Sequence, residues 1–273
     1  MLDLGAPVVM GVLNVTPDSF SDGGRFAERD AALRHARRMI EEGAAIIDIG
    51  GESTRPGAAP ATVAEELERV VPVVEALRRE SAAFISVDTS KPEVMRAACA
   101  AGADIINDVR ALREPDALLA AARTRAGICL MHMKGEPRTM QAAPAYDDVI
   151  SEVSVFLAER VAACRTAGID SARLTVDPGF GFGKRIVDNL ALLKHLGVLR
   201  KLGVPLAVGL SRKSMLAKIT GRDVDDRTAG SIALAAIAVL NGARIVRAHD
   251  VAATVDAVRV AAAVSLGEQF DGT

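Results

Sequence analysis

The run Ala44-Ala-Ile-Ile-Asp-Ile49 lies between two segments with helical periodicity, Arg29 to Glu42 and Thr62 to Arg79. Short apolar runs rich in β-branched residues are typical of parallel strands that are buried on both faces. Gly43 separates the first helical segment from the run, at a position where a left-handed helix cap favours glycine. This helix, strand, helix pattern predicts an α/β protein with a parallel sheet.

Seven further runs of the same kind occur along the chain: Val8 to Leu13, Phe84 to Val87, Asp104 to Ile106, Ile128 to Met131, Leu174 to Val176, Leu206 to Gly209 and Arg244 to Val246. Helical segments follow most of them: Pro92 to Ala101, Asp147 to Ala167, Asn189 to Lys201, Ala229 to Asn241 and Val251 to Val264. Dividing 273 residues by eight gives about 34 residues per unit, close to one strand with its crossover helix and loops. No linker divides the chain, so we predict a single TIM-barrel domain, (β/α)8, over residues 1–273. A doubly wound open sheet is the alternative, because periodicity alone does not show whether a parallel sheet closes.

Composition narrows the range of partners and compartments. The chain has 33 Lys and Arg against 35 Asp and Glu, 3% aromatic residues and no Trp. With no global positive field and few stacking side chains, neither nucleic acid nor an acidic membrane surface is an expected partner. Cys99, Cys129 and Cys164 stand too far apart for a disulfide framework or a thiolate metal site. Since there is no 18-residue apolar run and no basic leader segment, we expect a cytoplasmic protein.

Polar side chains follow most of the predicted strands, where active sites form in a (β/α)8 barrel. In chain order they are Asn14, Asp48 with Glu52-Ser53-Thr54-Arg55, Asp88, Asn107-Asp108, His132, Asp177, Ser211-Arg212-Lys213-Ser214, and Arg247 with His249. Helix capping explains any one of them but not the whole set. His132 is equally well explained as a core histidine at a strand end.

Two kinds of site are predicted at this end of the barrel. Asp88, Asn107 and Asp177 offer acceptors and a few donors to a flat polar heterocycle such as an aminopyrimidinone. Arg247 and His249 stand at alternate positions before a predicted helix, which favours anion binding. Lys213 and Asn14 extend this second group of residues, so we expect carboxylates on one side of the barrel mouth and cations on the other. The alternative for Arg247 is a salt bridge to an Asp at the barrel rim.

Three glycine-rich segments follow strands. Residues 14–24 and 50–57 are longer than ordinary βα turns, and we expect them to form extended lids or substrate loops. The third, Asp177-Pro-Gly-Phe-Gly-Phe-Gly-Lys184, only superficially resembles a nucleotide-binding motif. It lacks the Walker spacing and has Arg185 where Ser or Thr is required, and it lacks the third glycine of the dinucleotide pattern.

Eight segments from residue 10 to residue 250 resemble, in order, the motifs of dihydropteroate synthases, the folate-pathway enzymes that sulfonamides inhibit. They are Met10-Gly-Val-Leu-Asn-Val-Thr-Pro-Asp-Ser-Phe-Ser-Asp-Gly-Gly24, Asp48-Ile-Gly-Gly-Glu-Ser-Thr-Arg-Pro-Gly57, Ser86-Val-Asp-Thr89, Ile106-Asn-Asp-Val109, Met131-His132, Asp177-Pro-Gly-Phe-Gly-Phe-Gly183, Gly209-Leu-Ser-Arg-Lys-Ser214 and Arg247-Ala-His-Asp250. The first two are long and specific, and the last is short.

The resemblance implies a TIM-barrel transferase that condenses 6-hydroxymethyl-7,8-dihydropterin diphosphate with p-aminobenzoate, releasing diphosphate and 7,8-dihydropteroate. It assigns the pterin to Asp88, Asn107, Met131, Asp177 and Lys213, the diphosphate to Asn14, Thr54, Arg247 and His249, and p-aminobenzoate to Thr54, Pro56, Phe182 and Ser214. Asp22 and Arg55, from the two long loops, join Asp88, Asp177 and Lys213 as expected catalytic residues. Asn14 is also the expected Mg²⁺ ligand.

The resemblance further implies a homodimer formed through late helices, for which the Ala-rich stretch from Ala229 to Ala243 offers an apolar surface. Two other functions share the heterocycle pocket. One is a pterin-binding methyltransferase domain, which needs no diphosphate site, and the other is a non-catalytic pterin-binding paralogue. Thr54, Arg55, Arg247 and His249 argue against both.

Overall fold

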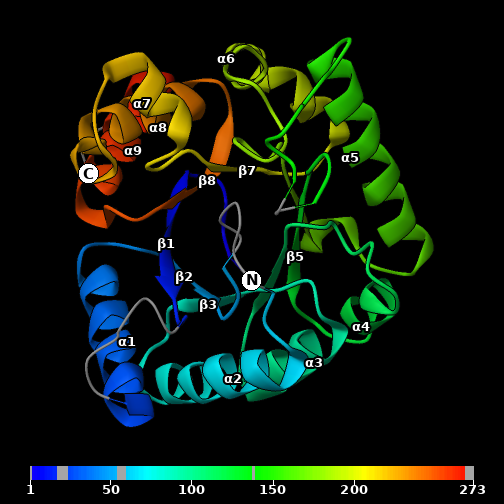
Figure 1. The fold of residues 1–273 in the computed structure, drawn as a ribbon, viewed down its shortest axis with the longest axis vertical. Helices are drawn as coiled ribbons and strands as arrows, with labels where there is room; N and C mark the ends of the chain where they lie inside the picture. The colour runs from blue at the N-terminus through cyan, green and yellow to red at the C-terminus, as the bar shows by residue number, and fades with distance from the viewer. Residues whose placement is uncertain (1, 17–23, 54–59, 137–138, 268–273) are drawn as a thin grey trace.

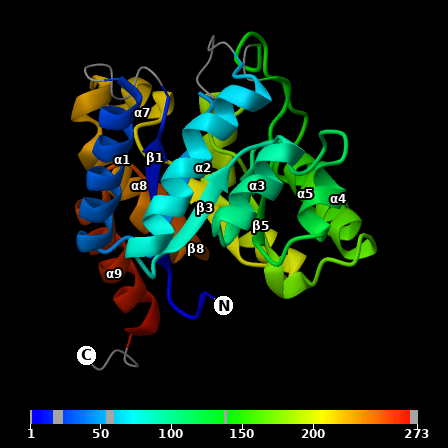
Figure 2. The same ribbon diagram turned by 90° about the horizontal axis from the view of Figure 1, so that it is seen from below.

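A computed structural model describes residues 2–16, 24–53, 60–136 and 139–267. The described residues form a closed barrel of eight parallel strands in sequential order. In Figure 1 the strands occupy the centre and the helices surround them, and Figure 2 shows the same ring from the side. The predicted (β/α)8 TIM barrel is therefore confirmed, and the open-sheet alternative is wrong.

The strands are β1 (Val8–Asn14), β2 (Ile46–Gly50), β3 (Phe84–Asp88), β4 (Ile105–Asp108), β5 (Gly127–Met131), β6 (Leu174–Asp177), β7 (Leu206–Gly209) and β8 (Ala243–Ala248). Each overlaps one of the eight predicted runs. Several extend by a residue or two into the polar positions at their C-terminal ends, because backbone pairing there depends on the neighbouring strand and not on side-chain polarity.

The α-helices are α1 (Gly24–Glu41), α2 (Val63–Glu80), α3 (Pro92–Ala101), α4 (Ala117–Ala122), α5 (Val149–Thr166), α6 (Ile186–Lys194), α7 (Ser214–Thr220), α8 (Thr228–Leu240) and α9 (Val251–Leu266), with 3₁₀ turns η2 (Ser171–Arg173), η3 (Leu196–Leu202) and η4 (Val224–Asp226). Helices α4 and α7 were not predicted, since six or seven residues are too few to show a period. The predicted helix Asn189 to Lys201 is instead α6 followed by η3.

Local sequence signals set several helix ends. Thr62 and Glu65 form a capping box at the start of α2. Gly102 ends α3 with φ 114°, a left-handed conformation that side chains with a Cβ rarely adopt, and Gly43 follows α1 with φ 100°. Gly43 was predicted to be a cap of this kind.

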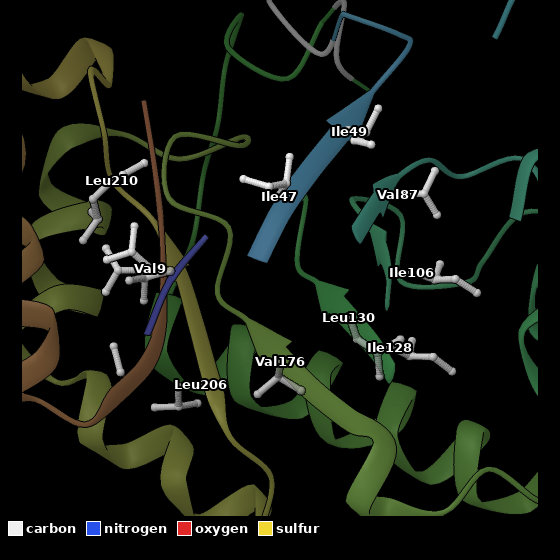
Figure 3. Packing of buried hydrophobic residues seen from close by; sticks show 14 of the residues in the cluster. Val9, Ile47, Ile49, Val87, Ile106, Ile128, Leu130, Val176, Leu206 and Leu210 are labelled. Atoms are coloured by element: carbon white, nitrogen blue, oxygen red, sulfur yellow. The ribbon is translucent and has the colours of Figure 1, made fainter. Parts of the chain in front are cut away.

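Alternation along the strands divides the apolar residues into two layers. Residues on the outer face pack against the helices in one large cluster, which includes Ile47, Ile49, Val87 and Leu130 (Figure 3). A second cluster, separate from the first, contains Met10, Ile46, Cys129, Ala207 and Ile245. Because Ile46 alternates with Ile47 and Ile49 along β2, this second cluster is the apolar filling of the barrel interior.

The same alternation carries polar residues into the upper barrel. Asp48 lies two residues after Ile46, and Arg247 lies two residues after Ile245. Strand register sets the height of the other polar residues along the barrel axis. Asp88 pairs with Gly50 of β2 on one side and with Asn107 of β4 on the other, so Asp88 and Asn107 lie at the same height. The polar residues at the strand ends therefore form a layer above the apolar filling.

Two features bear on compartment. Within the residues that the structure describes, no helix combines the length and apolar character needed to cross a bilayer. Cys99, Cys129 and Cys164 are free thiols, of which Cys129 and Cys164 are buried.

Candidate active site

An arginine lies between two carboxylates at the mouth of the barrel. Arg247 Nε lies 2.6 Å from Asp48 Oδ2, and its Nη2 lies 2.8 Å from Asp88 Oδ2. The Asp48 side chain has no exposed surface, and that of Arg247 is 25% exposed. The salt-bridge alternative for Arg247 is thus present in the structure. The expected separation of carboxylates from cations across the mouth is wrong, because the guanidinium from β8 reaches the acids of β2 and β3.

Asp48 also orients an amide in the pocket. Asn107 Nδ2 donates to Asp48 Oδ2 over 3.2 Å, on the same oxygen that Arg247 contacts. Asp48 Oδ1 and the hydroxyl of its cross-strand neighbour Ser86 are buried without a hydrogen-bond partner among the described residues. Sequence reasoning noted Asp48 at a strand end but gave it no role. The sequence does contain an indication of this role. Asp48 is an acid within an otherwise apolar run, two residues after Ile46, so the two side chains point to the same face of the strand, into the barrel.

A third carboxylate, Asp177, is held by a different kind of contact. The backbone N–H of Gly179 donates to Asp177 Oδ1 over 2.7 Å. Burial raises the pKa of Asp177 to about 6, against the opposing effects of this hydrogen bond and of Lys213. Burial likewise raises the pKa of Asp88 to about 7, with Arg247 opposing the rise and Asp48 adding to it. Both carboxyl groups therefore titrate near neutral pH.

Lys213 forms a contact with an aromatic ring on the β6 side of the pocket. Its Nζ lies 4.3 Å from the centroid of the Phe182 ring, a cation–π contact. Burial lowers the pKa of Lys213 to about 8, and the neighbouring Arg247 acts in the same direction. Phe182 packs against a small apolar cluster that includes Met131 and Met133. Met131 and Asp177 are paired in register, so an apolar surface lies directly beside the carboxylate.

His249 and the start of α9 form a corner suited to an anion. The His249 backbone N–H donates to Ser211 Oγ over 3.2 Å, and the ring Nδ1 lies 3.1 Å from the same oxygen. Asp250 precedes α9 but makes no capping hydrogen bond, because Arg212 engages its carboxylate with contacts of 3.1 and 2.5 Å. Burial and the nearby Arg247 lower the pKa of His249 to about 4, so its ring is neutral at pH 7.

Asn14 ends β1 beside this pocket and pairs in register with Gly50. A Cβ at Gly50 would lie 3.8 Å from Asn14 Oδ1, 3.8 Å from Asp88 Oδ2 and 3.5 Å from Asp88 Cβ. Glycine at this position therefore keeps the space between Asn14 and Asp88 open. A cavity of about 430 Å³ lies over the ends of β2 to β4 and reaches Asp88 and Thr89.

The structure thus brings together most of the predicted residues. Nine of them come from the C-terminal ends of the strands or the loops that follow: Asn14, Asp88, Asn107, Met131, Asp177, Phe182, Lys213, Arg247 and His249. Ser214 is exposed next to Lys213 at the start of α7. Asp22, Thr54, Arg55 and Pro56 lie outside the described residues. His132 is buried against Phe156, with ring centroids 4.9 Å apart, which confirms its interpretation as a core histidine.

Comparisons with known proteins point to one group. A family model described as pterin binding enzyme matches residues 10–249. The dihydropteroate synthase of Escherichia coli (strain K12) is 55% identical over 259 residues, which cover 95% of this chain and 92% of that protein. A solved Yersinia pestis dihydropteroate synthase with a sulfonamide drug complex matches with a TM-score of 0.93 at 51% identity and covers 97% of both chains. A Xanthomonas albilineans dihydropteroate synthase with 4-aminobenzoic acid matches with a TM-score of 0.92 at 55% identity, over 97% of this chain and 96% of that one.

Proposed function

This chain belongs to the dihydropteroate synthases, and we propose that it acts by dissociative displacement at the pterin methylene. These pterin-binding transferases condense 6-hydroxymethyl-7,8-dihydropterin diphosphate with p-aminobenzoate. An aryl amine is a weak nucleophile, whereas diphosphate leaves readily once its charge is balanced. The observation that carries this mechanism is the pair of buried carboxyl groups, Asp88 and Asp177, which both face Lys213 and Arg247.

The carboxylates stabilise the pterin cation. When diphosphate departs, positive charge develops on the heterocycle, and fixed negative groups in a buried site lower the energy of that state. Each such group typically lowers the activation barrier by about 3 kcal/mol. Asp88 and Asp177 perform this role when ionised, and Met131 lies beside Asp177 as an apolar surface for the ring.

The Arg247 ion pairs support a ligand that carries N–H donors. The guanidinium presents N–H donors to Asp48 and Asp88. An aminopyrimidinone also carries amino and ring N–H donors along one edge, so the pterin competes for the same carboxylate oxygens. When the pterin takes over Asp88, Arg247 becomes available to the diphosphate, which is the partner that the resemblance assigns to it.

The diphosphate corner is completed by His249 and α9. Since the hydroxyl of Ser211 can donate to His249 Nδ1, the neutral ring then carries its proton on Nε2 and donates it outward. The first turn of α9, which the side chain of Asp250 does not cap, supplies backbone N–H groups and the positive end of the helix dipole. These donors balance negative charge as the C–O bond breaks.

The residues present fit a shared Mg²⁺ ion. Asn14 offers an amide oxygen, a ligand type that Mg²⁺ accepts, and among the described residues no group of three or more His, Cys, Asp or Glu side chains could hold a metal by itself. Asn14 would hold such an ion, which would supply Lewis-acid stabilisation of the leaving diphosphate.

The p-aminobenzoate subsite lies on the β6 to β7 side. Phe182 with Lys213 above its ring forms one wall, and Ser214 is exposed next to Lys213. Thr54 and Pro56 complete this subsite by resemblance, and Asp22 and Arg55 stay predictions of the same kind. Sulfonamides then compete for this space as mimics of p-aminobenzoate.

A homodimer is supported by an apolar surface on the last two helices. Ile237 and Leu240 of α8 and Val260 and Val264 of α9 are exposed, with Val260 and Val264 each 65% accessible. Light scattering of the Val260→Asp variant tests the dimer, and we expect a monomer where the wild type is a dimer. A wild-type monomer at micromolar concentration contradicts it.

The three free thiols support the expected cytoplasmic location, where cysteines stay reduced.

The decisive assay is diphosphate release from the pterin substrate. We expect turnover that requires both Mg²⁺ and p-aminobenzoate and that a sulfonamide blocks competitively. Pterin binding with no diphosphate release in the presence of both would favour the non-catalytic paralogue. Methyl transfer to a corrinoid would favour the methyltransferase alternative.

A further inference from the structure

Lys184 has a buried side chain that the mechanism above does not use. It follows the glycine-rich segment 177–183 and is only 3% exposed. Its Nζ lies 2.8 Å from the Gly179 carbonyl oxygen, 3.1 Å from the Phe182 carbonyl oxygen and 2.9 Å from His132 Nδ1. The His132 carbonyl oxygen is a fourth acceptor at 3.4 Å, so the three N–H donors of the ammonium are all engaged by the protein.

The acceptors come from two different loops. Gly179 and Phe182 belong to the loop after β6, and His132 follows β5. The loops touch through their backbones, since a Cβ at Gly179 would lie 1.9 Å from the His132 carbonyl oxygen and one at Gly183 would lie 2.0 Å from that of Lys134. Gly179 and Gly183 also have positive φ angles of 68° and 64°. Glycine thus allows the close approach, and the lysine is folded back into the space between the loops.

This junction carries groups that face the substrates. Asp177 ends β6 and Phe182 lies within the loop that follows it, while Met131 ends β5 directly before His132. The loop is held on its outer side as well, because Tyr146 donates to the Gly183 carbonyl over 2.9 Å and Gly181 N–H donates to Asn189 Oδ1 over 2.7 Å. Lys184 is the charged member of this set of contacts.

We propose that Lys184 is a positioning residue for the condensation: its buried ammonium joins the β5 and β6 loops, fixes Phe182 in the p-aminobenzoate subsite and places a positive charge behind Asp177. The inference rests on the proposed function, because its readouts are substrate kinetics. It differs from a nucleotide-binding role for the same motif, since the ammonium is turned inward and fully engaged by the protein.

Charges around the junction give the proposal a pH signature. Asp177 faces the Gly179 N–H and Lys184 from its own loop, Lys213 beyond β7 and Arg247 on β8. Lys184 in turn faces Asp177, Lys213, Asp188 on α6 and the ring of His132. Among these, burial lowers the pKa of Lys184 to about 7, and Asp177 opposes that change. Below pH 7, where Asp177 titrates, Lys184 carries its proton, so removing the ammonium leaves Asp177 with fewer cations and raises its pKa.

The test compares Lys184→Met with Lys194→Met, which removes an exposed lysine from the end of α6. For Lys184→Met we expect kcat/KM for p-aminobenzoate to fall about tenfold or more, as for the loss of hydrogen bonds from a charged donor. We also expect the acid limb of the pH profile to shift to higher pH by about half a unit or more. Lys194→Met should match the wild type in both. Rates are normalised to active sites titrated with a pterin ligand.

Lys184→Arg separates the two roles and covers the case in which Lys184→Met does not fold. Lys184→Arg keeps the charge behind Asp177, so the acid limb of the pH profile should stay in place. Because the guanidinium is larger than the ammonium and does not fit the same acceptors, KM for p-aminobenzoate should rise. An acid limb of Lys184→Met at the wild-type position overturns the proposal, as does an unchanged KM in Lys184→Arg. If the wild type itself releases no diphosphate, the proposed function fails. This outcome is distinct from any result with the Lys184 variants, which are measured relative to an active wild type.

Discussion

The two sides of the barrel mouth neutralise their carboxylates in different ways. On the β2, β3 and β8 side, Asp48 and Asp88 contact the guanidinium of Arg247 directly, at 2.6 and 2.8 Å. On the β6 and β7 side, Asp177 accepts the Gly179 N–H at 2.7 Å, and Lys213 acts at longer range. The first arrangement can be exchanged, because a ligand with N–H donors can replace the arginine. The second is fixed by the backbone before the substrate arrives.

The fixed side should be the more costly one to alter. We expect Asp177→Asn to lower kcat for diphosphate release about 100-fold, the effect of losing about 3 kcal/mol of preorganised stabilisation. Steady-state assays with both substrates saturating measure this change. Asp256→Asn, on the exposed face of α9, is the matched control and should retain wild-type turnover. Near wild-type turnover in Asp177→Asn would show that its charge does not stabilise the cation.

Titration of both sides gives the next largest effect. Because burial raises the pKa of Asp88 to about 7 and that of Asp177 to about 6, both gain protons as the pH falls. The protonated forms are neutral and do not stabilise a cation, so kcat/KM for the pterin should fall. Asp88 alone predicts a loss of about tenfold between pH 8 and pH 6, and Asp177 adds to it. A profile that is flat down to pH 5 contradicts these pKa values.

The exchangeable side can be altered without touching a group assigned to the substrate. In Asp48→Asn, Arg247 loses its charged partner at Nε while the amide retains one oxygen. We expect kcat/KM for the pterin to fall about tenfold, since the loss of a hydrogen bond to a charged group is typically worth 1.5–3 kcal/mol. The acid limb should also move to lower pH, because Asp48 raises the pKa of Asp88. Unchanged kinetics would mean that Asp48 is only part of the core.

The smallest effect is expected at the anion corner. Ser211→Ala removes the oxygen that holds both His249 N–H and Nδ1. Loss of neutral hydrogen bonds predicts a decrease in kcat of about threefold, together with weaker product inhibition by diphosphate. Inhibition constants for diphosphate, measured beside those of wild type, check this expectation. Tighter diphosphate inhibition in the variant would remove Ser211 from the diphosphate site.

Sequence periodicity predicted the barrel because its strands and helices are local features. Strand β7 and helix α3 fall where they were predicted, residue for residue. Short helices were missed, as α4 and α7 show, because packing and not amphipathic pattern defines them. Residues 17–23 and 54–59 include several predicted site residues and lie outside the described part of the chain.

The arrangement of charges was beyond the sequence for a related reason. Arg247 and Asp48 are 199 residues apart and meet only because β8 closes the barrel against β1, which pairs with β2 on its other side. Similarly, the motif that ends in Lys184 could be excluded as a nucleotide site by spacing alone. That its lysine folds back between two loops depends on backbone contacts at Gly179 and Gly183, which spacing does not show.

The central claim is that the pocket stabilises a pterin cation before the amine attacks. It can be tested with pterin substrate labelled with ¹⁸O at the oxygen that joins the methylene to the diphosphate. We predict that wild-type enzyme moves the label from the bridging to the non-bridging positions without p-aminobenzoate, and that Asp177→Asn slows this exchange about as much as it slows turnover. Full turnover with p-aminobenzoate but no exchange in its absence would contradict the account, because the bond would then break only under attack by the amine.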